Sequence, residues 1–298
     1  MEKVIYLDNN KQLTLKAGEL SYLFKIEKEN SLAEVLVDLI NNRLRVLKLE
    51  GQNINQLLQS ILEIAKLNHL GKIWAVATPG QWQLLFKNGY ILEGILPKYF
   101  GEEEAYYMAY FLNPSRRISK LIEEEDALIK NLQQQNLNGN CPDLPIGYEM
   151  RLGTLEDANE LANFYDKIFP TYPTPMHNPN YVKKMINNCV IFNLVLWNGN
   201  IIAAASADIE ESSKTAEMTD IACDPEHRGK QIPVIAIKRL EEKMQELNMK
   251  TLYTLARAKL PGINKVFYRL GYEYYGRLIN NCDIFDGYED MNLLVKIL

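Results

Sequence analysis

The sequence predicts an α/β (α+β, three-layer) fold with a mixed central sheet flanked by helices, and three observations support it. Segments with strand and helix patterns alternate through the second half of the chain, which is the order that builds a layered α/β domain. Asn198-Gly199-Asn200 separates two apolar runs, a strong short-range signal for a β-hairpin. With 47% apolar and 24% charged residues among 298, the chain has the composition of an ordinary globular protein.

The elements of the second half follow from their apolar periodicity and from the turn residues between them. Pro233 suits the first turn of a helix, because proline lacks the N–H group that an interior helical position needs. We expect strands at residues 148–152, 190–197, 201–208, 215–223 and 251–256, with two more closing the chain. We expect helices at residues 155–168, 181–187, 233–247 and 261–270.

The composition changes at residues 131–145 (NLQQQNLNGNCPDLP), after a helix expected at residues 115–132. Gln, Asn, Gly and Pro dominate there and the apolar periodicity stops, which is typical of a linker. The sequence therefore predicts two domains, an N-terminal α/β domain at residues 1–138 and a C-terminal domain at residues 139–298.

The first half contains a segment that resembles the end of the second half. Residues 85–90 (LFKNGY) match residues 267–272 (FYRLGY), and an aromatic strand with a methionine, Met108 or Met291, follows each at similar spacing. This pattern indicates two related halves, although similarities this short also arise by chance. Phe86 stands at the position of Tyr268 and has no hydroxyl group, so we expect the first half to be structural.

Charge and composition exclude several classes of partner. The net charge is -5 and the pI about 5.5, with no basic stripe, so we expect no nucleic-acid partner. No apolar run reaches the roughly 18 residues of a membrane span. The N-terminus lacks the apolar region of a signal peptide, and the four scattered cysteines suit a reducing, cytoplasmic location. The three histidines show no ligand spacing, so we expect no metal, and a homodimer is compatible with the sequence.

One loop has the features of an anion-binding site. Residues 228–233 (RGKQIP) lie between an expected strand and an expected helix. Backbone N–H groups at the N-terminus of a helix bind phosphates well. A plain turn before an amphipathic helix is the alternative. The residues that would bind the anion are Arg228, Gly229, Lys230, Gln231, Ile232 and Pro233.

The strand before this loop carries two acidic residues. Simple alternation places Glu217 on one face with Ile221 and Cys223, and Asp220 on the other face with Ala222. Burying an unpaired carboxylate is costly, and its pKa rises. Glu217 is therefore a candidate base for an amine of pKa about 10.4, with a surface acid on an edge strand as the alternative. We do not expect Cys223 to act as a nucleophile, because no histidine lies close in sequence.

The order of this strand, this loop and the segment 264–272 resembles the coenzyme A half of GCN5-related N-acetyltransferases. The resemblance implies that acetyl-CoA is the acyl donor and that the backbone of Ile221, Ala222 and Cys223 pairs with its pantetheine arm. It also implies that Tyr268 is the general acid and that Asn264 and Phe267 contact the coenzyme; a core aromatic is the alternative for Tyr268. Gln231 and Pro233 replace small residues of the family pattern.

Further motifs resemble the beta-lysine N-acetyltransferase family: EMTD at residues 217–220, YTLARA at 253–258, EDMN at 289–292 and GYILEG at 89–94. This resemblance implies transfer of an acetyl group to the ε-amine of beta-lysine, which gives an osmolyte-type compatible solute. It places Tyr172 in the acceptor wall. A diamino acid also needs an anion for its second amine and a cation for its carboxylate. By position we expect Asp220 in the first role and Arg257 in the second, with a surface residue near the end of its strand as the alternative for Arg257. Another small amine, such as lysine or a polyamine, and a non-catalytic acyl-CoA-binding module are the alternatives.

Overall fold

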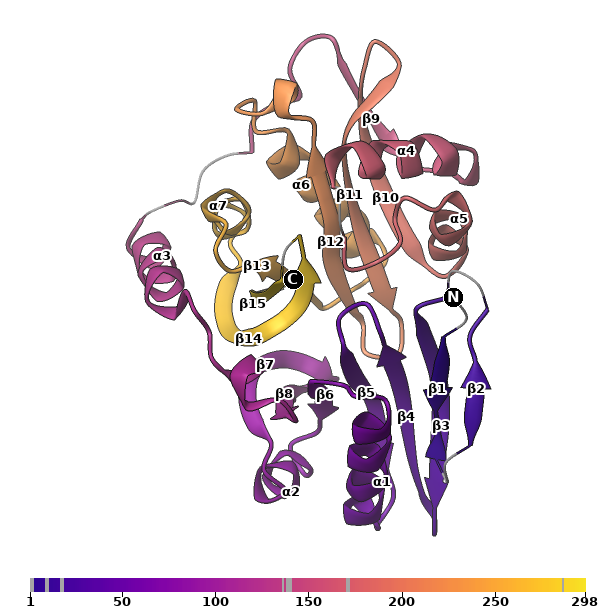
Figure 1. Cartoon of the computed structure of the whole chain (residues 1–298). Coiled ribbons are helices and arrows are strands. Elements are labelled where there is room, and N and C mark those ends of the chain that lie inside the picture. Colours follow the sequence, from indigo (N-terminus) through magenta and orange to yellow (C-terminus); the bar gives the residue numbers. More distant parts are fainter. Residues whose placement is uncertain are drawn as a thin grey trace.

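The computed structural model describes residues 3–8, 11–16, 19–135, 137, 141–169, 172–285 and 287–298. One mixed sheet of thirteen strands runs through the molecule, and helices cover its faces (Figure 1). The predicted α/β fold class is confirmed. Within the described residues, no helix has the length and apolar character needed to cross a membrane. The domain boundary expected at residues 138/139 lies outside the described residues.

The first half contributes six strands to the large sheet. In spatial order from the outer edge they are β3 (Ser21–Lys28), β4 (Ser31–Asp38), β5 (Arg43–Glu50), β6 (Lys72–Ala77), β8 (Glu103–Phe111) and β7 (Ile91–Phe100). Three helices belong to this half of the sequence: α1 (Ile54–Leu67), α2 (Trp82–Lys87) and α3 (Ile122–Gln134). A separate hairpin consists of β1 (Val4–Tyr6) and β2 (Gln12–Thr14).

The second half continues the same sheet. From the centre outward its strands are β14 (Glu273–Ile284), β15 (Gly287–Ile297), β13 (Thr251–Arg257), β12 (Thr215–Cys223), β11 (Asn200–Glu210), β10 (Val190–Trp197) and β9 (Tyr148–Leu152). Its helices are α4 (Ala158–Ile168), α5 (Pro179–Asn187), α6 (Ile232–Glu246) and α7 (Pro261–Arg269). These elements match the predicted ones closely.

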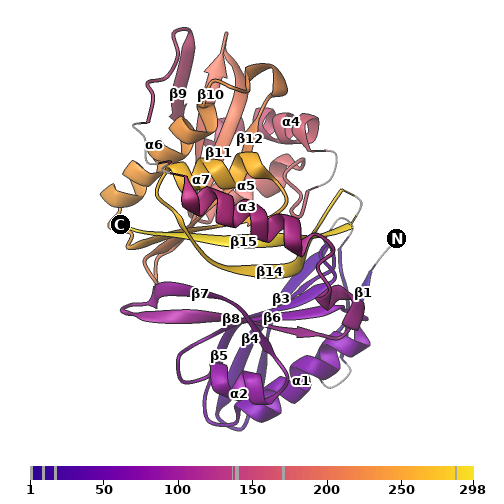
Figure 2. The same ribbon diagram turned by 90° about the vertical axis from the view of Figure 1, so that its left-hand side faces the viewer.

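Two predicted helices begin later than expected, and side-chain caps explain why. Thr154 and Asp157 form a capping box over a 3₁₀ turn, so α4 begins at Ala158. In the expected helix 115–132, a 3₁₀ turn at Pro114–Arg117 comes first, and Arg116 is held there because its guanidinium donates to the backbone oxygen of Asn280. Helix α3 starts only at Ile122 and lies beside α7 (Figures 1 and 2).

The strand order repeats. Read from the centre of the sheet, β7-β8-β6-β5-β4-β3 corresponds to β14-β15-β13-β12-β11-β10, and β5–β6 and β12–β13 are both parallel pairs. The matching turns agree in detail: Gly89 and Gly271 have φ of 86° and 85°, and the next residue donates its N–H five residues back in each case. The similarity of residues 85–90 and 267–272 therefore reflects a repeat of topology.

The register corrects one part of the expected repeat. Met108 pairs with Leu92 across β7 and β8, and Leu294 pairs with Tyr274 at the equivalent place in β14 and β15. Met291 is therefore not the counterpart of Met108.

The two half-sheets meet at one close backbone contact. Strands β7 and β14 pair at Gly94 and Gly276, and Figure 2 shows the two strands stacked at the middle of the molecule. A Cβ atom on Gly276 would lie 2.3 Å from the backbone oxygen of Glu93. The fully buried Lys72 crosses the same seam, because its Nζ donates to Oε2 of Glu93 at 2.8 Å and to the backbone oxygen of Ile279 at 2.9 Å.

Strand β12 contains a bulge next to the positions where its pairing with β11 and β13 changes. Asp220 has φ of 50°, and the pairing with β11 shifts register between Ala204 and Ser206. A bulge adds a residue to one strand and bends it. Strand β12 pairs with β13 only at residues 215–217, so the two strands separate beyond that point. The gap between them is where a ligand groove opens.

The bulge overturns the expected alternation of side chains in β12. Met218 and Cys223 both join the apolar core under α6, whereas Ala222 joins the core beneath α4. Strict period-2 counting places Ala222 with Met218 instead. The extra residue at Asp220 shifts the phase by one, which a sequence pattern alone does not reveal.

The seam generates the first testable prediction. Gly276→Ala should lower the free energy of unfolding by about 3 kcal/mol, because the new methyl group strains a φ of 150° and meets the Glu93 carbonyl. Chemical denaturation followed by circular dichroism measures the loss. Gly80→Ala, where a Cβ atom meets only ordinary contacts, is the control and should change stability little. Equal effects in the two variants would contradict the close contact at the seam.

Candidate active site

A groove of about 490 Å³ opens where β12 and β13 separate. Residues from the end of β12, from the loop before α6 and from one side of α7 line it. The structure brings together most of the residues predicted to bind the coenzyme. Those in the lining are Ile221, Ala222, Cys223, Arg228, Gly229, Gln231 and Pro233.

The loop before α6 has the backbone of an anion site. Gly229 and Gln231 have φ of 80° and 61°, so a glutamine adopts the left-handed conformation, at a cost of about 1–2 kcal/mol. The backbone N–H groups of residues 229–232 donate to no group among the described residues. Pro233 is the second residue of the helix and removes one donor from this set. Lys265 and Arg269 of α7 add positive charge to the same groove.

Four of the predicted coenzyme residues lie outside this lining. Lys230 is exposed and donates to the hydroxyl of Tyr148 at 2.6 Å. Ile232 and Phe267 are fully buried in the core under α6. Asn264 is also fully buried, and its amide donates to the backbone oxygens of Arg257 and Leu260. Asn264 therefore fixes the end of β13 against α7 and shapes the groove from behind.

Tyr268 faces away from the groove. Gly262, Val266 and Arg269 line the groove from one side of α7, and Tyr268 lies on the other side, packed against the core. Its hydroxyl lies beside Gln133 of α3, and burial raises the pKa of Tyr268 to about 12. The geometry does not bring this hydroxyl to either ligand cavity, so the general-acid role remains a prediction without structural support.

A second cavity, of about 330 Å³, continues from the groove. The two share Ile221, Arg257, Leu260 and Ile263, so they meet at the bulge of β12. We call the second one the acceptor cavity. Its walls come from both halves of the chain, because Arg43, Arg45 and Trp74 of β5 and β6 face it as well. The first half, which we expected to be structural, therefore supplies part of the wall of this cavity.

Three carboxylates line the acceptor cavity: Asp208, Glu217 and Asp220. Asp208 and Glu217 are direct cross-strand partners on β11 and β12. Burial, and then the neighbouring Asp208, raise the pKa of Glu217 to about 7. Asp208 is exposed overall, but its carboxylate is partly desolvated at the cavity, and this desolvation, and then Asp220, raise the pKa of Asp208 to about 6. Within the described part of the chain, no cation lies within ion-pair distance of any of the three.

Asp220 is held by neutral hydroxyl groups. Tyr172 donates to its Oδ1 at 3.1 Å and Ser206 to its Oδ2 at 2.8 Å, while Tyr165 donates to its backbone oxygen at 2.6 Å. Burial raises the pKa of Asp220. The carboxylate thus holds Tyr172 in the wall of this cavity.

Arg257 lines both cavities, but its guanidinium is already bound. Its Nε and Nη2 atoms donate to the two carboxylate oxygens of Glu289 at 2.7 and 2.6 Å. Lys259 pairs with the same carboxylate at 2.9 Å. A bidentate pair of this kind leaves Arg257 little capacity for a second carboxylate. The role predicted for Arg257 in binding the acceptor therefore lacks support from the geometry.

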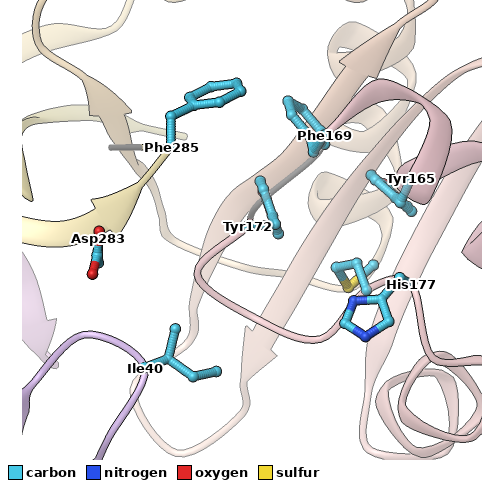
Figure 3. Close-up of a pocket in the computed structure, with 8 residues that line it drawn as sticks. Ile40, Tyr165, Phe169, Tyr172, His177, Asp283 and Phe285 are labelled. Atoms are coloured by element: carbon cyan, nitrogen blue, oxygen red, sulfur yellow. The ribbon is translucent and has the colours of Figure 1, made fainter. Parts of the chain in front are cut away.

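A third cavity, of about 320 Å³, adjoins the acceptor cavity across the stacked pair Phe169 and Tyr172. Phe169 lines all three cavities. Figure 3 shows walls from the β4–β5 turn (Ile40), from the β14–β15 end (Asp283 and Phe285) and from α4 and the loop that follows it (Tyr165, Phe169, Tyr172 and His177).

Neither nucleophilic catalysis by Cys223 nor a metal site finds support among the described residues. Burial raises the pKa of Cys223 to about 11, which keeps this thiol protonated at neutral pH. Among the residues that the structure describes, no group of three or more His, Cys, Asp or Glu side chains could hold a metal ion. The groove and the acceptor cavity remain as the places where chemistry can occur.

Sequence reasoning missed many residues of the acceptor cavity, among them Asp208, Arg45 and Trp74. Asp208 lies opposite Glu217, and counting back across the turn between the predicted strands 201–208 and 215–223 would have found it. Arg45 and Trp74 had no local signal, because only the packing of the two halves brings them to the cavity.

The placement of Tyr268 gives a direct test. Tyr268→Phe should leave kcat within about threefold of the wild type, because the hydroxyl lies beside Gln133 of α3 and lines neither the groove nor the acceptor cavity. A general acid would instead lose about 10²- to 10⁴-fold in kcat. Steady-state kinetics with saturating acyl donor distinguish the two outcomes, and a large loss of kcat with unchanged stability would contradict the placement.

Comparisons with known proteins identify the family. Residues 158–272 match the family model "Acetyltransferase (GNAT) family". A beta-lysine N(6)-acetyltransferase of Methanococcus maripaludis is 31% identical over 87% of this chain and 93% of its own length. N-acetyltransferase YodP of Bacillus subtilis is 35% identical over 88% and 94%, and a beta-lysine N(6)-acetyltransferase of Methanosarcina mazei is 34% identical over 79% and 94%. The chain therefore belongs to the GNAT family of acetyltransferases, in the group that contains these beta-lysine N(6)-acetyltransferases.

Proposed function

We propose that this acetyltransferase moves an acetyl group from acetyl-CoA to the ε-amine of a small diamino acid, most closely fitting beta-lysine. One observation carries the proposal. The groove that suits the coenzyme leads directly into a cavity in which the carboxylate of Glu217 has no ion-pair partner among the described residues. The names of the two archaeal relatives support beta-lysine as the acceptor.

The residues of the groove suit the coenzyme. The backbone N–H groups of residues 229–232 and the N-terminus of α6 would hold its pyrophosphate, with Arg228 and Arg269 nearby. Beyond residue 217 the edge of β12 is no longer paired with β13, so the backbone at residues 221–223 is available to the pantetheine arm. When bound, acetyl-CoA supplies the activated acetyl thioester.

Glu217 would act as the general base. The attacking amine must lose a proton, and its pKa in solution is about 10.4. A carboxylate with a pKa near 7 is a stronger base than an ordinary glutamate, so the proton transfer is less uphill. Its location on β12, four residues before the shared Ile221, places it inside the acceptor cavity and allows transfer through a water molecule.

The charges of the cavity fit a diamino acid. Asp220, the residue expected to bind the amine that is not acetylated, already accepts hydrogen bonds from Tyr172 and Ser206. Asp208 offers another carboxylate for that amine. Acetylation removes one positive charge, which gives the neutralised product typical of a compatible solute. A polyamine is the second candidate, favoured by the excess of acidic groups in the cavity. The four cysteines are free, which suits the cytoplasm where we place the reaction.

The acceptor is tested by thiol release from acetyl-CoA with beta-lysine, lysine and spermidine as acceptors. We expect the highest kcat/KM with beta-lysine. Greater turnover of spermidine would replace the diamino acid by a polyamine. Binding of acetyl-CoA without turnover of any amine would favour a coenzyme-binding module instead.

The pKa of Glu217 predicts a pH dependence. The base is active only when ionised, so kcat/KM should rise between pH 6 and 8 with an inflection near pH 7. Glu217→Gln should lower kcat by about 10²- to 10⁴-fold and remove this inflection. Exposed Glu149→Gln is the control and should keep the wild-type profile. An inflection that survives in the Glu217→Gln variant would exclude Glu217 as the base.

Glu217→Gln should stabilise the folded protein, although it lowers the activity. The pKa of Glu217 is higher in the folded than in the unfolded protein, so its ionisation in the folded state costs stability as the pH rises. Glu217→Gln should therefore raise Tm more at pH 8 than at pH 5. Thermal unfolding at the two pH values also confirms that the variant is folded.

A further inference from the structure

The geometry points to Arg45, on β5 of the N-terminal half, as the residue that binds the carboxylate of the acceptor. This inference rests on the proposed function and specifies its acceptor as an amino acid rather than a plain amine. The first half of the chain would then determine the specificity of the reaction that the second half carries out.

Of the guanidinium groups in the acceptor cavity, that of Arg45 is available to bind a carboxylate, because the other two are already bound by protein groups. Three guanidinium groups line the acceptor cavity. Arg257 is bound to Glu289, and Arg43 is bound to Asp38 at 2.9 Å and to the backbone oxygen of Asn281 at 2.9 Å. Arg45 forms no ion pair with any described residue, and its Nε atom is buried without a hydrogen-bond partner. A buried donor without a partner costs free energy, which a bound carboxylate would recover.

Trp74 holds this guanidinium in place. Arg45 and Trp74 are direct neighbours in the parallel β5–β6 ladder, and the guanidinium carbon lies 4.8 Å from the centroid of the indole. The edge of Tyr107 packs against Trp74 with ring centroids 5.1 Å apart, which fixes the indole. A guanidinium stacked on an aromatic face keeps its N–H edge free for a planar anion such as a carboxylate.

The repeat of the fold places Arg45 at the counterpart of Glu217. Asn42 and Lys214 have φ of 47° and 53°, and each accepts a backbone hydrogen bond, from Gly71 and Lys250 respectively, just before the parallel ladder begins. Counting three residues onward reaches Arg45 in β5 and Glu217 in β12. Both side chains line the same cavity. Equivalent positions in the two halves therefore supply a cation and an anion to one site.

This pairing of charges matches an amino acid better than a polyamine. The carboxylates Asp208 and Glu217 attract ammonium groups, whereas Arg45 repels them. An acceptor that carries both charges satisfies both sides of the cavity. A polyamine would leave the guanidinium without an anion and place a cation beside it.

The test compares beta-lysine with its decarboxylated analogue, which keeps both amines and lacks only the carboxyl group. In the wild type, kcat/KM should favour beta-lysine. Arg45→Gln should raise KM for beta-lysine by about 10- to 100-fold, with no loss on the analogue. Because burial raises the pKa of Glu217 and the charge of Arg45 opposes that rise, kcat should stay nearly unchanged only above about pH 8, where Glu217 is ionised. Arg45→Lys should restore part of the affinity. Arg239→Gln, at an exposed position on α6, is the matched control.

The outcomes separate this inference from the proposed function. Equal losses on both acceptors in the Arg45→Gln variant, or no loss on either, would overturn the role of Arg45 while acetylation of beta-lysine by the wild type still stood. A wild type that acetylates the analogue as well as beta-lysine would also overturn it. A wild type that acetylates neither compound but acetylates spermidine would overturn the proposed acceptor, and the role of Arg45 with it.

Discussion

The close contact of Gly94 with Gly276 is the constraint on which the rest of the structure depends. Two glycines allow the backbones of β7 and β14 to meet. The buried pair of Lys72 and Glu93, both from the first half, hydrogen bonds across the seam to the backbone oxygen and N–H group of Ile279. The contact joins two half-sheets into one. It thereby brings β5 of the first half to face β12 of the second, so that neither half contains the complete acceptor cavity.

A local distortion gives the second half its chemistry. The left-handed backbone of Asp220 bends β12 away from β13 and opens the groove, and its carboxylate orders the aromatic wall through Tyr172. The region between α2 and β5 of the first half is arranged differently. There the side chain of Gln81 donates to the backbone oxygen of Leu49 at 2.8 Å and bridges α2 to the end of β5. We propose that residues 1–138 are a degenerate copy of the acetyltransferase half that lost the groove but kept a wall of the cavity.

Local patterns in the sequence predicted what depends on local structure. The predictions of the hairpin, of the loop before α6 and of the acidic residue Glu217 all rested on neighbouring residues in the chain. In that loop Gln231 stands where the family pattern has a small residue, and it adopts a left-handed backbone conformation. Features that depend on three-dimensional packing were out of reach. A bulge within β12 shifts the faces of the strand, and only the packing of α7 shows that Tyr268 lies on the side away from the groove. Arg45 depends on the pairing of two distant halves.

The central claim is that the two halves build one acceptor site. The most direct measurement is a crystal structure of the protein with coenzyme A and beta-lysine. We expect the amine that is acetylated to lie between the thiol and Glu217, and the carboxylate to accept hydrogen bonds from Arg45 above Trp74. A carboxylate bound at Arg257 instead, or an acceptor bound without contact to β5 and β6, would contradict a site shared by the two halves.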